Sequence, residues 1–137
     1  MTETEAPAWP VADPTKRCPC LSGLPYGECC APYHQGASVA PTAERLMRSR
    51  FSAYAFGLDE YLLATWHPST RPVDLDLDPA QRWYRLDILS HSRGGMLDTV
   101  GTVEFAASYR LEGRSGVQRE NSRFERMSGR WFYIDEV

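Results

Sequence analysis

All four cysteines of this chain fall within thirteen residues, in the spacing C-x-C-x8-C-C. Glycine and proline interrupt residues 18–40 so often that no long helix or strand can form there. A segment below about 40 residues rarely buries a core large enough to fold, and it usually needs a metal ion or disulfides. Two pairs of cysteines at the two ends of a loop can bring four thiolates around one tetrahedral ion. The pattern predicts a metal-binding module over residues 18–40, with ligands Cys18, Cys20, Cys29 and Cys30.

The redox setting decides between a metal ion and disulfides. Residues 1–17 are acidic and proline-rich and lack the apolar stretch of a secretory signal, so we interpret them as a disordered leader. Because no run of about 18 apolar residues is present, we predict no membrane span and a cytoplasmic protein. Cytoplasmic thiols stay reduced, and clustered cysteines there bind metals more often than they form disulfides. We therefore predict zinc, with iron as the alternative because thiolates accept both; disulfides or ordinary buried thiols are the structural alternatives.

The bulk composition excludes several classes of protein. Of the 137 residues, 42% are hydrophobic and 12% are aromatic, which is enough for a folded core and too much for a disordered chain. A formal charge of −3 gives no bulk attraction to nucleic acid or to an anionic membrane. Neither is therefore expected as a partner.

Residues 41–137 change from helical to strand periodicity. Thr42 is a good N-cap for a helix that should end at Gly57, and Asp59 begins a shorter one that should stop near Trp66, before Pro68. A proline-rich loop over 68–80 follows. From Trp83 onward the period is two, and strands are predicted from Trp83, over 99–111, 117–127 and 130–134, with a turn at Gly113 and Gly116 and a hairpin at Ser128-Gly129. Helices followed by antiparallel strands predict an α+β domain, with the helices packed on one face of a curved sheet.

The cysteine segment resembles the SEC-C motif, the small zinc module at the C-terminus of the SecA translocation ATPase. The Cys-x-Cys pair, Ser22-Gly23, Tyr26 and the paired terminal ligands match the motif. The last ligand is commonly histidine in SecA, and Cys30 stands there in this chain. Leu21 stands where glycine is frequent, and Leu24-Pro25 replaces the usual lysine-rich stretch, which weakens any inference of contact with acidic partners.

The rest of the chain is similar to the YchJ-like family, which couples an N-terminal SEC-C motif to a nuclear-transport-factor-2-like domain. The matching blocks are residues 46–51, 61–62, 65–68, 122–124 and 131–135. This resemblance implies a cone-shaped cavity between the helices and the curved sheet of residues 41–137. It supplies a fold and no established reaction.

Side chains that could work inside such a cone are aromatic, basic or acidic. His67 is the candidate general acid or base, although it could instead hydrogen-bond the backbone while Trp66 fills the core. Arg48 or Arg50 could join the module to the domain or bind an anionic ligand, and Asp87 or Glu104 could supply a strand-borne acid. The predicted ligand-binding residues are Arg50, Tyr54, Trp66, His67 and Trp83.

Three functions follow as hypotheses. The first is a metal-binding, non-enzymatic protein whose cone binds a small molecule or a partner. The second is a small isomerase, dehydratase or hydrolase that uses His67 with an acid from the sheet, which the fold alone does not establish. The third, which follows from the SEC-C resemblance only, is SecB-like or ribosome-associated partner binding through the metal module. Because the module is too small to fold alone, we also expect metal removal to unfold only residues 18–40.

Overall fold

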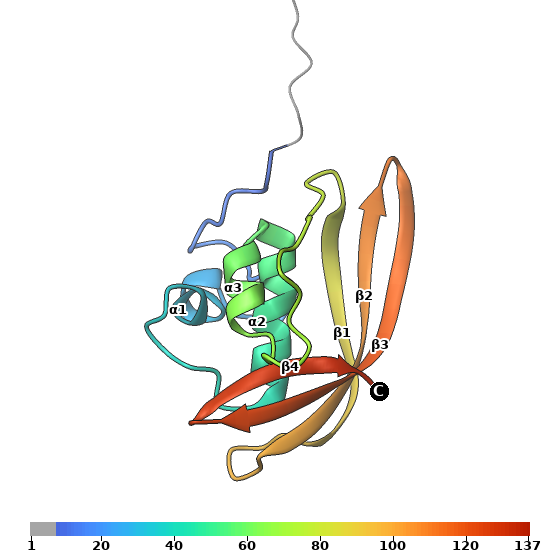
Figure 1. The fold of residues 1–137 in the computed structure, drawn as a ribbon. Helices are drawn as coiled ribbons and strands as arrows, with labels where there is room; N and C mark the ends of the chain where they lie inside the picture. Colours follow the sequence, from blue (N-terminus) through green and yellow to red (C-terminus); the bar gives the residue numbers. More distant parts are fainter. Residues whose placement is uncertain (1–7) are drawn as a thin grey trace, which may run out of the picture.

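The computed structural model describes residues 8–137 as two helices set against one curved sheet, with the cysteine segment packed beside them (Figure 1). The segment contains the short helices η1 (Tyr26–Glu28) and α1 (Ala31–His34). The four strands form an antiparallel meander in the order β1-β2-β3-β4. The predicted α+β class with a curved antiparallel sheet is confirmed. The domain elements are α2 (Ala43–Phe56), α3 (Asp59–Ala64), β1 (Arg82–Arg93), β2 (Val100–Leu111), β3 (Arg114–Met127) and β4 (Arg130–Glu136).

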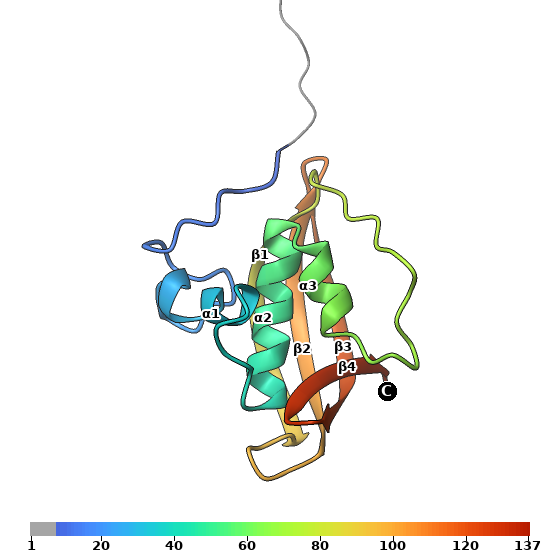
Figure 2. The same ribbon diagram turned by 60° about the vertical axis from the view of Figure 1, so that its left-hand side comes forward.

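The two helices begin and end largely where the sequence signals lie. The Thr42 hydroxyl accepts a hydrogen bond from the Arg45 N–H at 3.1 Å, and Gly57 ends α2 in the left-handed region at φ 73°. In α3 the boundary differs by one residue, because Leu58 occupies the N-cap position and Asp59 is the first helical residue. Figure 2 shows α2 lying along the sheet with α3 beside it.

The β2–β3 turn is tighter than predicted. Glu112 and Gly113 form a two-residue loop with φ of 52° and 78°, so β3 begins at Arg114. Gly116 lies inside β3 opposite Tyr109, and a Cβ there would stand 2.5 Å from the tyrosine ring. The predicted turn at Gly116 is therefore wrong, since this glycine makes room for an aromatic ring. The predicted hairpin at Ser128-Gly129 is confirmed.

One continuous core joins the cysteine segment to the domain. The four buried cysteines belong to the same apolar cluster as Phe51 of α2, Phe105 of β2 and Phe124 of β3. Each of these phenylalanines is at most 4% exposed. The cysteine segment thus shares its interior with α2 and the sheet.

Residues 8–17 of the expected leader also contact the fold. The Gly27 N–H donates to the Pro14 carbonyl at 2.9 Å, and the Tyr26 N–H donates to the Lys16 carbonyl at 2.8 Å. The Trp9 ring occupies the space beside Gly57, where no Cβ would fit. Residues 1–7 of the expected leader lie outside the described residues.

The helices of residues 8–137 are short, the longest being the 14-residue α2. None of them combines the length and the apolar character that crossing a membrane would take.

Candidate metal centre and cavity

Local backbone turns bring the cysteines of the first pair together. The Leu21 N–H donates to the Cys18 carbonyl at 3.0 Å, and the Cys18 N–H donates to the Leu24 carbonyl at 3.0 Å. Leu21 adopts a left-handed φ of 61°, which explains why glycine is common at this position of the SEC-C motif. Cys29 and Cys30 follow η1 directly and precede α1, so the second pair lies at a helix junction.

The four sulfur atoms have the spacing of a tetrahedral metal site. All of them lie within 4.8 Å of one another, with 3.6 Å between Cys20 and Cys29 and 3.9 Å between Cys29 and Cys30. A tetrahedral ion with metal–sulfur distances of about 2.3 Å gives sulfur–sulfur edges of about 3.8 Å. All four cysteines are free thiols, and the separation of 3.6 Å exceeds the bond of about 2.05 Å in a disulfide. The cluster could therefore hold one metal ion.

Hydrogen bonds among the thiols show how closely the cluster is coupled. The pKa of the Cys20 thiol is lowered because Cys18 and Cys30 donate to its sulfur. The hydrogen bond to Cys20 correspondingly raises the pKa of Cys18 to about 11, and the pKa of Cys30 is raised by its bonds to Cys18 and Cys20. Neighbouring thiol protons thus stabilise a negative sulfur, and a bound cation would take their place.

Side chains outside the ligand set hold the sulfurs against α2. The buried Ser52 hydroxyl lies 3.4 Å from the sulfurs of both Cys18 and Cys30, and donates to the latter. Ser22 supplies a hydroxyl 3.0 Å from the Cys29 sulfur. Partners of this kind orient metal ligands. Sequence analysis missed Ser52, whose only signal is its helical spacing from Arg48.

Arg48 joins the metal segment to the domain. Its Nη1 donates to the Cys20 carbonyl at 2.8 Å, while its Nε pairs with Glu44 one turn earlier at 3.1 Å. Of the two roles considered for Arg48 and Arg50, Arg48 therefore takes the bridging one.

A partly buried histidine, which sequence analysis also missed, makes a second link. His34 Nε2 donates to the Ser49 carbonyl at 2.8 Å, so its Nδ1 accepts from the Tyr26 hydroxyl at 2.7 Å. Burial lowers the pKa of His34, which favours this neutral form. Tyr61 of α3 joins this series of hydrogen bonds, since its hydroxyl lies 2.7 Å from the Ser49 hydroxyl. Polar contacts therefore tie the metal segment to both helices.

The second feature is a cavity of about 250 Å³ between α2 and the sheet. Four of the five predicted ligand-binding residues line it, namely Arg50, Tyr54, Trp66 and Trp83. Three further lining residues, Gln118, Glu120 and Ser122, alternate along β3 and were missed, because the inward face of this strand cannot be read from its polar sequence.

His67 does not line this cavity. Trp66 forms a β-bridge with Tyr133 of β4, so the backbone is extended there and successive side chains point to opposite sides. Trp66 faces the cavity, and His67 therefore points away from it. His67 Nδ1 accepts from the Ser69 N–H at 3.1 Å, and its Nε2 lies 3.2 Å from a Glu125 carboxylate oxygen. The histidine has an acid partner, but the pair lies outside the cone.

The two strand acids considered for catalysis also lie elsewhere. Asp87 pairs with Arg85 at 2.9 Å, and Glu104 pairs with Arg119 at 3.2 Å. Neither acid lines the cavity between α2 and the sheet.

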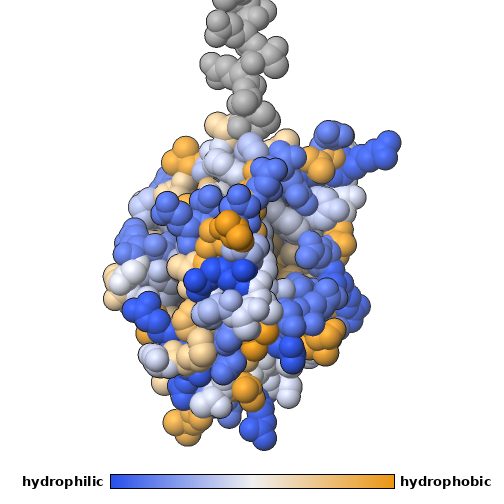
Figure 3. All heavy atoms as spheres, viewed as in Figure 1, coloured by the Kyte–Doolittle hydropathy of each residue, from blue (hydrophilic) through white to orange (hydrophobic). Residues whose placement is uncertain are grey.

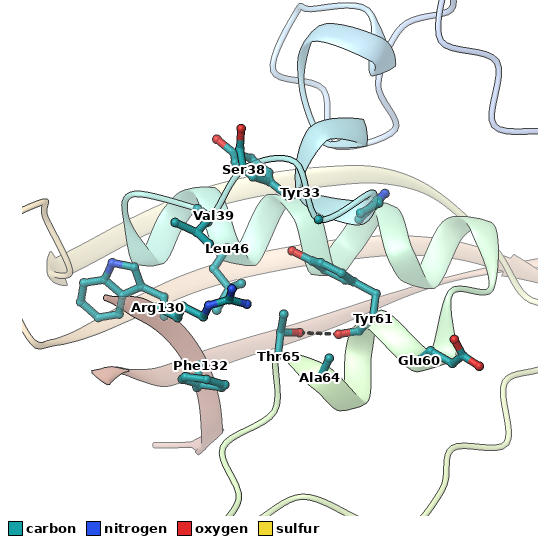
Figure 4. A pocket seen from close by; sticks show the side chains of 14 residues that line it. Tyr33, Ser38, Val39, Leu46, Glu60, Tyr61, Ala64, Thr65, Arg130 and Phe132 are labelled. Carbon is teal, nitrogen blue, oxygen red and sulfur yellow. Dashed lines mark hydrogen bonds between the residues drawn. The ribbon is translucent and has the colours of Figure 1, made fainter. Parts of the chain in front are cut away.

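A second hollow, of about 350 Å³, has three walls. They are the segment that follows α1, helix α3, and the start of β4. Figure 4 shows Tyr61 and Thr65 on one side of it, Val39 and Leu46 on another, and Arg130 and Phe132 of β4 beside them. The Thr65 hydroxyl donates a hydrogen bond of 2.9 Å to the Tyr61 carbonyl, one helical turn earlier.

The face seen in Figure 3 carries hydrophobic residues as small, separate spots among polar ones. No extended apolar patch for a protein partner is visible on this face. Within the metal segment, Leu21 and Leu24 are about two-fifths exposed, at 40% and 41%.

Comparison with known proteins places both parts of the chain. Residues 42–136 match the family model described as YchJ, middle NTF2-like domain, and residues 15–32 match the SEC-C motif. A UPF0225 protein of Corynebacterium glutamicum is 56% identical over 118 residues, covering 86% of this chain and 94% of that protein. A UPF0225 protein of Streptomyces coelicolor is 52% identical over 122 residues, covering 89% and 95%.

Two solved structures share the fold. The solution structure of a SEC-C motif containing protein from Rhodopseudomonas palustris has a TM-score of 0.78 at 32% identity, over 89% of this chain and 98% of that one. The crystal structure of a SEC-C motif containing protein from Psychrobacter arcticus has a TM-score of 0.74 at 26% identity, over 89% and 82%.

Proposed function

The chain belongs to the YchJ-like UPF0225 family, and from this premise we propose that it is a zinc-stabilised protein whose cone binds a small ligand. The observation that carries the metal assignment is the set of four buried sulfurs at tetrahedral spacing. Four cysteine ligands fill a tetrahedral shell and leave no open position for a substrate, which is typical of a structural zinc site. Iron is the alternative that the same sulfurs would accept.

Binding rather than catalysis is the role that the cavity supports best. Among the described residues, its lining contains no histidine or cysteine; burial raises the pKa of Tyr54 and of Tyr133, and the carboxylate of Glu120 already accepts from the Tyr133 hydroxyl. General acid–base work needs a titrating group within reach of the reacting atom. The His67–Glu125 pair lies outside the cone, so we favour a ligand-binding domain over an enzyme of the isomerase, dehydratase or hydrolase type.

We expect one zinc ion per chain. Native mass spectrometry of protein purified without chelator, together with elemental analysis, measures the identity and the stoichiometry of the metal. Metal-free protein with four thiols reactive to Ellman's reagent would contradict the proposal, and one iron per chain would support the alternative ion. The same spectra also report any small molecule retained in the cone.

We expect His67→Ala to leave ligand binding in the cone unchanged. The imidazole contacts the Ser69 N–H, the Ser69 hydroxyl and Glu125 outside the cavity, so its loss should cost only the stability of these exposed contacts, about 1 kcal/mol or less each. Titration of a cavity ligand and urea unfolding, each compared with wild type, check the two parts. A markedly weaker ligand affinity in a folded variant would restore the enzyme hypothesis.

A further inference from the structure

We propose that the cone binds a small, ring-bearing or branched organic carboxylate, with its carboxylate at Arg50, Trp66 and Ser122. This inference rests on the proposed ligand-binding role of the cone and names the chemical class of the ligand. It is carried by unpaired polar atoms at the inner end of the cavity, by the distribution of charge along its wall, and by its size.

Arg50 is a buried cation without a carboxylate partner. Its side chain lies on α2, the residue is 3% exposed, and no acid within the described residues forms an ion pair with it. Nη1 donates to the Leu62 carbonyl at 2.8 Å and to the Thr65 hydroxyl at 2.7 Å, and the residue lines the cavity beside Tyr54. Burying an unpaired charge is costly, and burial lowers the pKa of this guanidinium.

Aromatic rings compensate only part of that cost. The guanidinium carbon lies 5.1 Å from the centre of the Trp66 ring and 4.7 Å from that of Tyr133. Cation–π contacts of this kind offset only part of the cost of burying a cation. They hold the guanidinium in place but supply no full negative charge to offset its own.

Two other polar atoms of the same cavity are buried and have no hydrogen-bond partner. These are Trp66 Nε1 and the hydroxyl of Ser122, which come from the segment after α3 and from β3. Buried polar atoms are nearly always paired, so two orphans in one cavity indicate a missing partner. The Trp66 indole and the Arg50 guanidinium can only donate hydrogen bonds, and the Ser122 hydroxyl can donate one as well. A group with several acceptor atoms and a negative charge satisfies all three.

The charge gradient along β3 fixes the orientation of the ligand. Ser122 is fully buried, Glu120 is partly exposed and Gln118 is exposed, so this series runs from the inner end of the cavity outward. Glu120 accepts from the Tyr133 hydroxyl at 3.1 Å, which holds its carboxylate beside that ring. An anionic group is therefore favoured deep in the cone and opposed further out. With one cation and one acid in the cavity, a monovalent carboxylate fits better than a phosphate dianion.

The remaining wall is apolar and of suitable size. Phe51, Trp83 and Phe105 contribute rings or ring edges, and Met47 and Ala107 complete the apolar surface. An engineered apolar cavity of about 150 Å³ accommodates benzene. A cavity of about 250 Å³ can therefore take a ring together with a carboxylate.

The test compares phenylacetate with its neutral isostere phenylacetamide on the full, zinc-loaded chain. Calorimetry measures the affinity, and the indole N–H resonance of Trp66 reports whether the orphan donor gains an acceptor. We expect phenylacetate to bind about tenfold or more tightly than the amide, because it adds a charge-assisted hydrogen bond, and to shift that resonance downfield. Inorganic phosphate should not compete.

Variants separate a ligand role from a structural one. Ser122→Ala removes one orphan hydroxyl and should weaken phenylacetate about fivefold to tenfold, whereas Ser115→Ala, at an exposed position of the same strand, should not. Glu120→Gln should tighten binding, since it removes the acid that opposes an anion. Arg50→Gln should abolish binding, and its fold is checked by the amide-proton spectrum.

Two outcomes would overturn the inference. Equal affinity for acid and amide would keep a ligand-binding cone and reject the anion site. Failure of phenylacetate, benzoate and isovalerate to bind or to move the Trp66 resonance would reject the carboxylate class. Metal content is measured on the same sample, so a failure of the zinc assignment is seen separately.

Discussion

Removing the metal with a strong chelator is expected to abolish amide-exchange protection over residues 18–30 while the strands keep theirs. The apparent binding energy of structural zinc is about 10–16 kcal/mol in small finger peptides, which exceeds or equals the whole stability of a typical domain. The cysteine segment is too short to bury a core of its own that would supply energy of that size. Protection should persist at Val103, Phe105 and Phe124, which are at most 4% exposed in the sheet.

The structure extends this expectation to one side of α2. Ser52 contacts two of the sulfurs and Ser49 accepts from His34, so loss of the metal segment exposes both of these buried positions. Exchange should therefore rise around residues 49–53 as well, although the sequence alone predicts a loss confined to residues 18–40. Chelator with excess zinc is the control. Unchanged exchange in the cysteine segment would show that the ion is not structural, and loss in the strands would show one cooperative unit.

Features set by neighbouring residues could be predicted from the sequence. The cysteine cluster, the Thr42 cap and the Gly57 stop depend on short-range chemistry, and the structure has each of them. Gly116 shows where such reasoning fails. Gly113, three residues earlier, is in the turn, but Gly116 lies in the strand. A glycine is needed at position 116 because the Tyr109 ring of the adjacent strand fills the space of a Cβ, and no local sequence pattern reveals this contact.

The candidate sites divide in the same way. Arg50, Tyr54, Trp66 and Trp83, which the sequence predicts as ligand-binding residues, line the cavity between α2 and the sheet. His67 was placed in the cone with them, but one step along an extended segment turns its side chain outward. The surroundings of Ser52, His34 and Ser122 arise from packing between distant segments, and the spacing of Ser52 from Arg48 is too weak a signal to single it out.

Replacing Phe51 by alanine is expected to lower the free energy of unfolding by about 3–5 kcal/mol. Phe51 is 2% exposed on α2, belongs to the continuous core and packs edge-on against Trp83 at 6.3 Å between ring centres. The substitution deletes the buried ring and its packing contacts, and it leaves a void that the rigid sheet cannot fill. Because the residue also lines the cavity of about 250 Å³, the void adds to existing space instead of collapsing.

Phe56→Ala is the matched control, since Phe56 lies on the same helix but is only partly buried, against Tyr26. Urea unfolding of the zinc-loaded proteins should show the larger loss for Phe51 and a clearly smaller one for Phe56. The enlarged cavity should also admit bulkier carboxylates than the wild-type cone does. A loss below about 1 kcal/mol for Phe51→Ala would mean that the site relaxes almost completely. In that case the packing of α2 on the sheet would not depend on this ring. The residues around the cavity would then rearrange more easily than their close packing indicates.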